Sequence, residues 1–409
     1  MKAPSQCENS TTTKGVDWRQ ILPVFLIVCT YAAGTAAVLP VLPFHIRMMG
    51  GSPLVLGIVI AAEAAGQFAS APFLGQLSDR FGRKRILIVS HTIAAASLLL
   101  LAIAPNIAFI LLARALFGLT VGNISVTAAY VADRTDAANR RQAMGILMGG
   151  AGVGGIVGAG LSGLLSETSL TAPILASFGL VLLSVMVTVF RLDDRQAAPR
   201  PDDPSAIGKA SFRTILSSPG IRMLIMVMLC HFFAYGIYIS QMPVFLQDTF
   251  VWNGHAFGAR ELSYLIMADG GINVFAQIVL LGWLGRHLSE RGLVLLIFAL
   301  ISVGFLTAGI ATTIPVLVLA VVLVSTGDAL AKPTYMAALS TRVPSQRQGI
   351  VLGAAQSLVA VADIASPVLG GFILGYALYG VWIGTAAAMA LTGAVLAAAR
   401  LAPRNGDQV

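Results

Sequence analysis

Six aspartate, glutamate, lysine or arginine side chains lie well inside long apolar stretches of this sequence, where no water would solvate a charge. They are Glu63, Arg114, Asp269, Asp328, Lys332 and Asp363. A charged side chain at the centre of a bilayer costs about 2.5–3.5 kcal/mol on insertion scales, and such residues mark proton relays, ion pathways or substrate sites. We therefore predict that these residues take part in proton exchange and couple it to another process.

Glu63 stands alone among hydrocarbon side chains in the stretch 54–76, and Gln67 follows one helical turn later. Residues four apart share one face of a helix, so this face should meet protein rather than lipid. With no cation in its own stretch, burial should favour the protonated acid and allow proton exchange near neutral pH. Alternatively, Glu63 is a permanently neutral acid bonded to a neighbouring helix. Arg114 would oppose protonation if it reached Glu63.

Arg114 begins the pattern Arg114-x-x-x-Gly118-x-x-x-Gly122. The two glycines share one face, so a neighbouring helix can approach closely there. The arginine then has a functional role, as intramembrane charges do by default, or it is paired structurally or extends toward the membrane surface.

Asp328 and Lys332 are spaced to pair with each other on one helix, as a structural pair or as one that opens during transport. Asp363 and Asp269 are further candidates, each with polar residues on its own helical face.

A face of aromatic and polar side chains is expected along the stretch 221–245. Such stripes usually pack in a core, but phenol and imidazole groups need polar partners, which favours a cavity over lipid. A flat amphipathic organic compound would suit this wall. The predicted cavity residues are Gln67, Asn123, His231, Tyr235, Tyr238, Gln241, Met242, Asn273, Gln277 and Gln356.

No metal-ligand cluster, phosphate-binding loop or nucleophile–base pair stands out in the sequence. We therefore expect no cofactor, no metal and no enzymatic activity.

Membrane-spanning helices must position these residues. Hydrophobic residues make up 57% of the chain and charged residues 11%, against about 25% charged in soluble domains. Twelve apolar stretches have about the 20 residues that a span requires. They cover residues 21–44, 54–76, 86–104, 107–131, 142–165, 171–190, 221–245, 262–284, 293–311, 315–338, 348–375 and 379–399. We predict an all-α membrane protein with a six-helix bundle over 1–190, a cytoplasmic loop over 191–213 and a second six-helix bundle over 214–409.

The basic residues predict the orientation. With both termini in the cytoplasm, 22 of the 26 Lys and Arg fall in cytoplasmic segments, as the positive-inside rule requires. The net charge is +8, but the basic residues flank apolar stretches rather than forming a patch. No nucleic-acid partner is therefore expected. The polar segment up to Asp17 does not have the apolar core of a signal peptide. We expect a multi-pass protein of the bacterial inner membrane, in contact with lipid and functional as a monomer.

The most basic short segment reads Gly75-Gln-Leu-Ser-Asp79-Arg80-Phe-Gly82-Arg83-Lys-Arg. It is expected to be a tight cytoplasmic loop, with glycines that ease the turn and the approach of helices. Its simplest role is a topology anchor. It could also be a conformational latch, with Asp79 near the start of the stretch 348–375, where backbone N–H groups favour an anion. The predicted latch residues are Gly75, Asp79, Arg80, Gly82, Arg83, Asp133 and Asp136, the two arginines engaging the last two acids.

This loop resembles the signature loop of the major facilitator superfamily. A weaker copy, Leu288-Ser-Glu-Arg291, lies about half a chain later, as expected for parallel six-helix repeats. The motif Leu39-Pro-Val-Leu-Pro43 and the pattern from Arg114 are similar to the drug:proton antiporter group, and most of all to tetracycline-type exporters. The resemblance covers nearly the whole chain. It implies a central cavity and a role for Arg114 in coupling.

Two features depart from that group. The stretch 142–165 carries Gly158-Ala-Gly-Leu-Ser-Gly163 where a proline is usual, and the first stretch carries Tyr31-Ala-Ala-Gly34 where tetracycline exporters have an acid. The predicted function is proton-coupled export of a small amphipathic compound or drug by alternating access. The alternatives are a proton-coupled importer of a sugar, siderophore or metabolite, and a membrane sensor that transports nothing.

Overall fold

The computed structural model describes residues 18–135, 137–193, 218–343 and 348–401, which are helical almost throughout. One short hairpin pairs Val251 with Ala256 and Trp252 with His255. In chain order the elements are α1 (Trp18–Val38), α2 (Leu42–Met48), α3 (Pro53–Phe81), α4 (Arg83–Ala102), α5 (Ile107–Gly118), α6 (Asn123–Arg134), α7 (Ala137–Leu165), α8 (Thr171–Arg191), α10 (Pro219–Thr249), β1 (Val251–Trp252), β2 (His255–Ala256), α11 (Ala259–Phe275), η1 (Ala276–Leu280), α12 (Leu281–His287), α13 (Glu290–Ile310), α14 (Ile314–Thr341), α15 (Gln348–Gly375) and α16 (Tyr379–Arg400).

The apolar stretches fold as the sequence predicts. The described residues contain 12 helical segments long and apolar enough to cross a membrane, which confirms the all-α, twelve-span prediction. Three of these spans are interrupted: α1 continues into α2, α5 into α6, and α11 through the π-helical turn η1 into α12. Irregular backbone at membrane depth is tolerated where it is buried in protein or lines a cavity, so each interruption is a candidate functional position.

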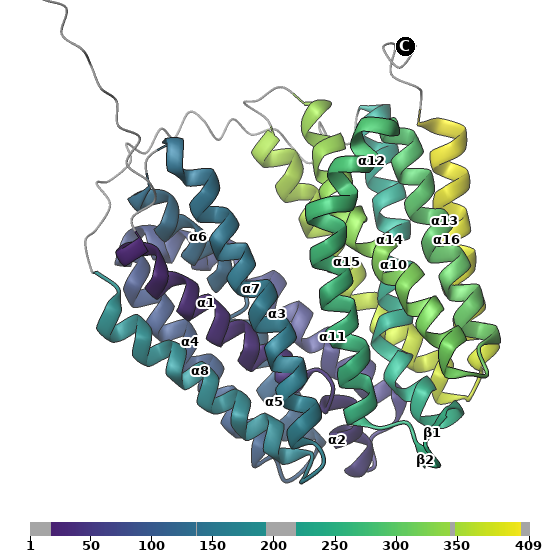
Figure 1. Ribbon diagram of the computed structural model, residues 1–409, viewed down its shortest axis with the longest axis horizontal. Coiled ribbons are helices and arrows are strands. Elements are labelled where there is room, and N and C mark those ends of the chain that lie inside the picture. The colour runs from purple at the N-terminus through teal and green to yellow at the C-terminus, as the bar shows by residue number, and fades with distance from the viewer. Residues whose placement is uncertain (1–17, 136, 194–217, 344–347, 402–409) are drawn as a thin grey trace, which may run out of the picture.

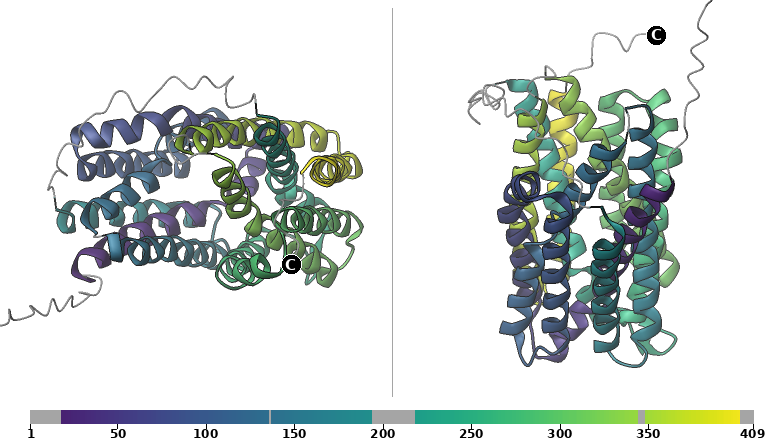
Figure 2. Two further views of the ribbon diagram at one scale, coloured as in Figure 1. Left: turned by 90° about the horizontal axis from the view of Figure 1, so that it is seen from above. Right: turned by 90° about the vertical axis from the view of Figure 1, so that its left-hand side faces the viewer.

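Two helical bundles lie side by side, one formed by α1 to α8 and the other by α10 to α16 (Figure 1). They are called the N half and the C half below. The bundles diverge at the face where α1 begins and α16 ends, the terminal face. They converge at the face that carries α2 and the β1–β2 hairpin, the hairpin face (Figures 1 and 2). Most of the predicted linker between the halves, residues 194–213, lies outside the described residues.

Glycines allow the two halves to touch near the hairpin face, where α3 packs against α15. A Cβ atom on Gly57 would collide with the Pro367 carbonyl, and one on Gly371 would collide with the Pro53 carbonyl. The two backbones are therefore in direct contact, which is the usual role of small residues at membrane helix interfaces. The halves also meet where α7 packs against α11.

Two ion pairs join the halves at the hairpin face. Arg47 on α2 binds Asp248 on α10 at 2.6 Å and Gln247 at 3.0 Å. Arg260 on α11 binds Glu167, which follows α7, at 2.5 Å. Tyr379 donates to the other oxygen of Asp248 at 3.0 Å. The Tyr379 bond lies within the C half, but the contacts of Arg47 and Arg260 cross between the halves, so they must break if this face opens.

The substitution Asp248→Asn should shift the protein away from the state closed at the hairpin face. A partly exposed ion pair contributes about 0.2–1 kcal/mol, so the population ratio should change by up to about fivefold. Distances between spin labels on α2 and α10 would measure this ratio. Glu290→Gln is the matched control, because it removes an ion pair with Arg342 of similar exposure that lies within the C half. If both variants gave the wild-type distance distribution, the Arg47–Asp248 pair would have no role in closure.

Candidate functional site

The fourth span is broken at mid-course between α5 and α6, where the sequence predicts a continuous helix over 107–131. Residues Leu119 to Gly122 form turns instead. The Thr120 N–H donates to Phe117 at 2.9 Å and the Asn123 N–H donates to Thr120 at 3.1 Å, both bonds reaching back three residues rather than four. The Thr120 hydroxyl lies 3.4 Å from the Tyr31 hydroxyl on α1. The break therefore places Asn123 at the start of a new helix inside the N half.

Glu63 on α3 forms an ion pair with Arg114 on α5. The Arg114 side chain is almost fully buried, and its guanidinium also lies 4.9 Å from the centre of the Phe117 ring. A Cβ atom on Gly118 would collide with the Glu63 carbonyl, so this glycine brings the two helices together as the sequence predicts. The condition that the sequence left open, that Arg114 reaches Glu63, is met here, so a cation 51 residues away balances the Glu63 charge.

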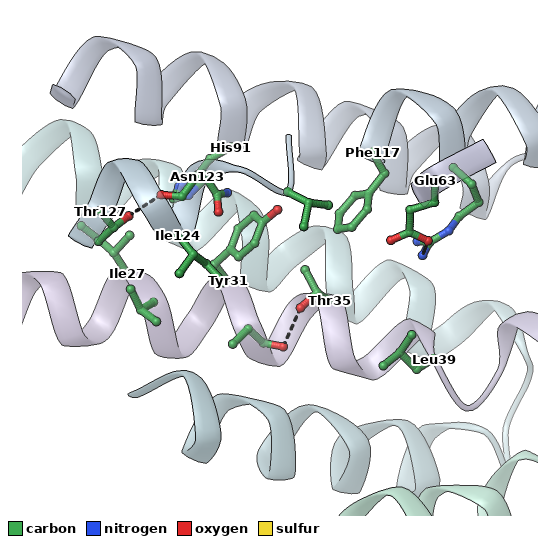
Figure 3. Close-up of a pocket in the computed structure, with 14 residues that line it drawn as sticks. Ile27, Tyr31, Thr35, Leu39, Glu63, His91, Phe117, Asn123, Ile124 and Thr127 are labelled. Atoms are coloured by element: carbon green, nitrogen blue, oxygen red, sulfur yellow. Dashed lines mark hydrogen bonds and ion pairs between the residues drawn. The ribbon is translucent and has the colours of Figure 1, made fainter. Parts of the chain in front are cut away.

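A pocket of about 240 Å³ lies within the N half and is lined by α1, α3, α4, α5 and α6. Figure 3 shows Glu63 at one end of this N-half pocket and Asn123 with Thr127 at the other, with Tyr31 between them. The Tyr31 ring stacks on His91 at 4.7 Å, and the His91 ring nitrogen lies 3.2 Å from the Ser184 hydroxyl. Sequence analysis missed Tyr31 and His91 as site residues. A lone histidine in the apolar stretch 86–104 was the available signal.

A larger cavity of about 530 Å³ lies between the halves. Its acidic lining residues are Glu63 of the N half and Asp269 and Asp363 of the C half, and Arg114 is its one cationic lining residue among those described. This central cavity shares Leu39, Glu63 and Arg114 with the N-half pocket. Of the cavity residues predicted from sequence, the structure places Gln67, Tyr235, Tyr238 and Met242 in its wall.

The other predicted cavity residues lie elsewhere. Asn123 lines the N-half pocket, and Asn273 and Gln277 bond to each other at 2.6 Å in a separate C-half pocket of about 320 Å³. Gln241 is fully buried and donates to the Pro367 carbonyl at 3.4 Å, and Gln356 contacts the Met336 sulfur at 3.8 Å.

His231 is also fully buried, away from the central cavity, so the predicted aromatic face of α10 is only partly a cavity wall. Its imidazole Nε2 lies 3.2 Å from the Asp328 carboxylate. The predicted Asp328–Lys332 pair is not formed in this conformation, because Asp328 turns toward α10 instead of along α14, although both residues line the C-half pocket. Lys332 lines the C-half pocket and interacts electrostatically with Asp363.

The interior charges of the two halves differ in balance. In the N half, Arg114 compensates Glu63. In the described spans of the C half, the Asp328 carboxyl group interacts electrostatically with those of Asp269 and Asp363, and Lys332 is the one lysine or arginine away from the helix ends. The described spans of the C half therefore hold more interior acids than interior lysines or arginines, and protons or a bound cation would balance the excess.

The basic loop is shorter than predicted. Helix α3 continues to Phe81, and Gly82 alone separates it from α4, with a φ of 94° that favours glycine. Gly75 lies within α3 with open space beside it, so it neither turns the chain nor contacts a helix here.

The predicted contact of Arg83 with Asp133 is present at 3.3 Å, and Arg83 also pairs with Asp79. Arg80 lies over the neighbouring Phe81 ring and pairs with no acid in the described part of the chain, and Asp136 falls outside that part. The Asp79 side chain is 65% exposed in this conformation, so it is free to take part in a contact that forms when the terminal face closes.

We expect Asp79→Asn to slow transport at least about tenfold while leaving expression unchanged. The neutral amide could no longer be drawn to the positive N-terminal end of α15, and coupling contacts of this kind are typically worth 5–150-fold. Initial rates in proteoliposomes, with Asp193→Asn as a control acid of the same half, would measure the effect. Normal transport by Asp79→Asn would leave the loop as a topology anchor.

Comparison with known proteins agrees with this architecture. The family model of the Major Facilitator Superfamily matches residues 24–367. The chain is 29% identical over 351 residues to the class C tetracycline resistance protein of Escherichia coli, covering 83% of this chain and 85% of the relative. It is 25% identical over 376 residues to multidrug resistance protein 2 of Bacillus subtilis (strain 168), covering 88% and 90%.

Solved structures share the fold. A D-xylose–proton symporter matches with a TM-score of 0.73 at 17% identity, covering 94% of this chain and 98% of that one. The human organic anion transporter MFSD10 matches with a TM-score of 0.66 at 21% identity, covering 93% and 99%. The family match, the twelve spans and the cavity between two six-span halves together show that this chain is a multi-pass membrane protein of the Major Facilitator Superfamily.

Proposed function

We propose that this protein exports small amphipathic cations from the cell in exchange for protons. The observation that carries the proposal is the central cavity, in which Glu63, Asp269 and Asp363 face Arg114 inside a wall of mostly hydrocarbon side chains. A cavity with more acids than bases attracts protons and cations alike. The two can therefore compete for the same carboxylates, which is what an antiporter requires.

The wall chemistry favours an amphipathic compound over a sugar. Leu42, Leu56, Ile60, Leu265 and Ile266 are among the lining residues and offer no hydrogen bonds. A sugar would leave hydroxyl groups unpaired against such a surface, at a cost of about 1–3 kcal/mol each. The relatives named as tetracycline and multidrug resistance proteins support export of a drug-like compound.

Orientation supports loading from the cytoplasm. The positive-inside distribution of Lys and Arg supports a terminal face that lies in the cytoplasm of a bacterial inner membrane. The halves diverge at this face (Figure 1). In alternating access by rocking of the two halves, the cation would enter here, and protons from outside would displace it after the hairpin face opens. We propose that one chain is sufficient for this cycle and that it involves no catalysis.

Transport of the fluorescent cation pyronin B into proteoliposomes tests the proposal. Pyronin B carries a permanent charge, so a pH gradient alone does not trap it. With an acidic lumen and the cytoplasmic face outward, exchange for one proton should accumulate the dye about tenfold per pH unit. Empty liposomes and collapse of the gradient with nigericin are the controls.

Each rival function predicts a different result in this assay. Accumulation with an alkaline lumen would identify a symporter, and no movement in either direction would favour a sensor.

A further inference from the structure

The N-half pocket contains two buried N–H donors that make no hydrogen bond of ordinary geometry with the described residues, although the Asn123 side chain lies close enough to the Tyr31 hydroxyl to interact with it. They are the Asn123 side-chain amide nitrogen and the Arg114 Nε. Asn123 is 2% exposed and Arg114 is 3% exposed. Both residues line the pocket. Buried polar groups in proteins almost always have partners, so each of these donors calls for an acceptor.

The other polar groups of the pocket are already engaged. Thr35 donates to the Ala32 carbonyl at 2.9 Å, and Thr127 donates to the Asn123 carbonyl at 2.9 Å (Figure 3). The Glu63 carboxylate binds Arg114. The Asn123 amide nitrogen and the Arg114 Nε are therefore the donors that the pocket can offer to a ligand.

Helix α6 adds to this preference. It has 12 residues and begins at Asn123, so its positive end lies at the pocket. Broken membrane helices present such ends to anionic groups of substrates. The arrangement favours an oxygen acceptor, and a carboxylate above all.

Size and wall chemistry define the rest of the ligand group. A cavity of about 150 Å³ already admits benzene, and this pocket measures about 240 Å³. Hydrocarbon side chains of Ile27, Val28 and Ile124 line it. It therefore has room for one aromatic ring that carries an oxygen acceptor.

We propose that the N-half pocket is a substrate subsite for an aryl carboxylate or aryl carbonyl group, while the cationic part of the same molecule lies in the central cavity. The proposal rests on the proposed function, because it assigns the two ends of the exported compound to two cavities. These cavities share Leu39, Glu63 and Arg114, so one molecule can occupy both. The acceptor would compete with Glu63 for Arg114, which links substrate entry to the state of that ion pair.

Two dyes that differ in one group test the subsite. Rhodamine B and pyronin B share the same tetraethyl diaminoxanthene cation, but only rhodamine B carries a carboxyphenyl ring. Binding of each dye to the full-length protein in nanodiscs is measured by fluorescence anisotropy. Asn123→Leu should weaken rhodamine B binding about tenfold, as expected for loss of one hydrogen bond to a charged group. Binding of pyronin B should stay within twofold of wild type.

Further variants distinguish loss of the donor from damage to the fold. Asn123→Asp keeps the side-chain shape and replaces the donor by an acceptor, so it should weaken rhodamine B binding at least as much. Thr30→Val is the control, since it removes a hydroxyl that bonds its own helix at 2.7 Å and lines neither cavity. It should leave both dyes unaffected.

The outcomes separate the subsite from the proposed function. Wild-type binding of pyronin B but not rhodamine B would overturn the subsite and leave cation export intact. Equal loss of both dyes in the Asn123 variants, or no loss of either, would also overturn it, the second result pointing to water as the partner of the donors. Failure of the wild type to bind either dye would overturn the proposed function and the subsite with it.

Discussion

Asp269→Asn and Asp363→Asn should each remove most of the proton-driven accumulation of pyronin B, whereas Glu63→Gln should not. Both aspartates line the central cavity and interact electrostatically with Asp328. A neutral amide at either position mimics a carboxyl that never releases its proton. Coupling free energies between sites are typically 1–3 kcal/mol, so accumulation should fall about 10–100-fold in a two-unit pH gradient.

The measurement compares accumulation with and without the pH gradient in the same proteoliposomes. A folded but uncoupled variant should give a ratio close to one and still exchange dye when the gradient is absent. Wild-type accumulation by both aspartate variants would exclude them as proton carriers. Loss of accumulation in Glu63→Gln alone would return the coupling role to the N half.

The spans of this protein could be predicted from sequence because membrane insertion is governed by local composition. A stretch such as 293–311 is apolar enough to cross a bilayer whatever it packs against. The ends of the spans were less predictable. Helix α3 continues through Ser78 and Asp79 to Phe81, because Arg83 pairs with one of these residues and hydrogen-bonds the other.

The partners of the interior charges could not be predicted, because they depend on which helix faces meet. The rule for residues four apart suggested a pair of Asp328 with Lys332, yet Asp328 binds His231, 97 residues away. The sequence did contain a signal for the Glu63–Arg114 contact. Gly118 marks the face of α5 that can approach another helix, but nothing in the pattern showed that the partner would be α3.

Arg114→Met should strongly destabilise the protein, and the double variant Glu63→Met/Arg114→Met should recover most of the loss. Removing one partner of a buried ion pair leaves an uncompensated charge, at a cost of about 3–5 kcal/mol, whereas replacing both by apolar side chains is often neutral. The free energy of unfolding in mixed detergent micelles would measure the cycle. Asp248→Asn provides a contrast, because its ion pair is partly exposed and should contribute less than about 1 kcal/mol.

The double variant also decides what the ion pair does in transport. If Glu63 and Arg114 only neutralise each other and position α3 against α5, the stable double variant should still accumulate pyronin B in response to a pH gradient. Its binding of rhodamine B should weaken relative to its binding of pyronin B, because the Arg114 donor is gone from the N-half pocket. A double variant as unstable as either single one would contradict the balanced pair. A stable double variant without proton-driven accumulation would show that protons pass through Glu63 after all.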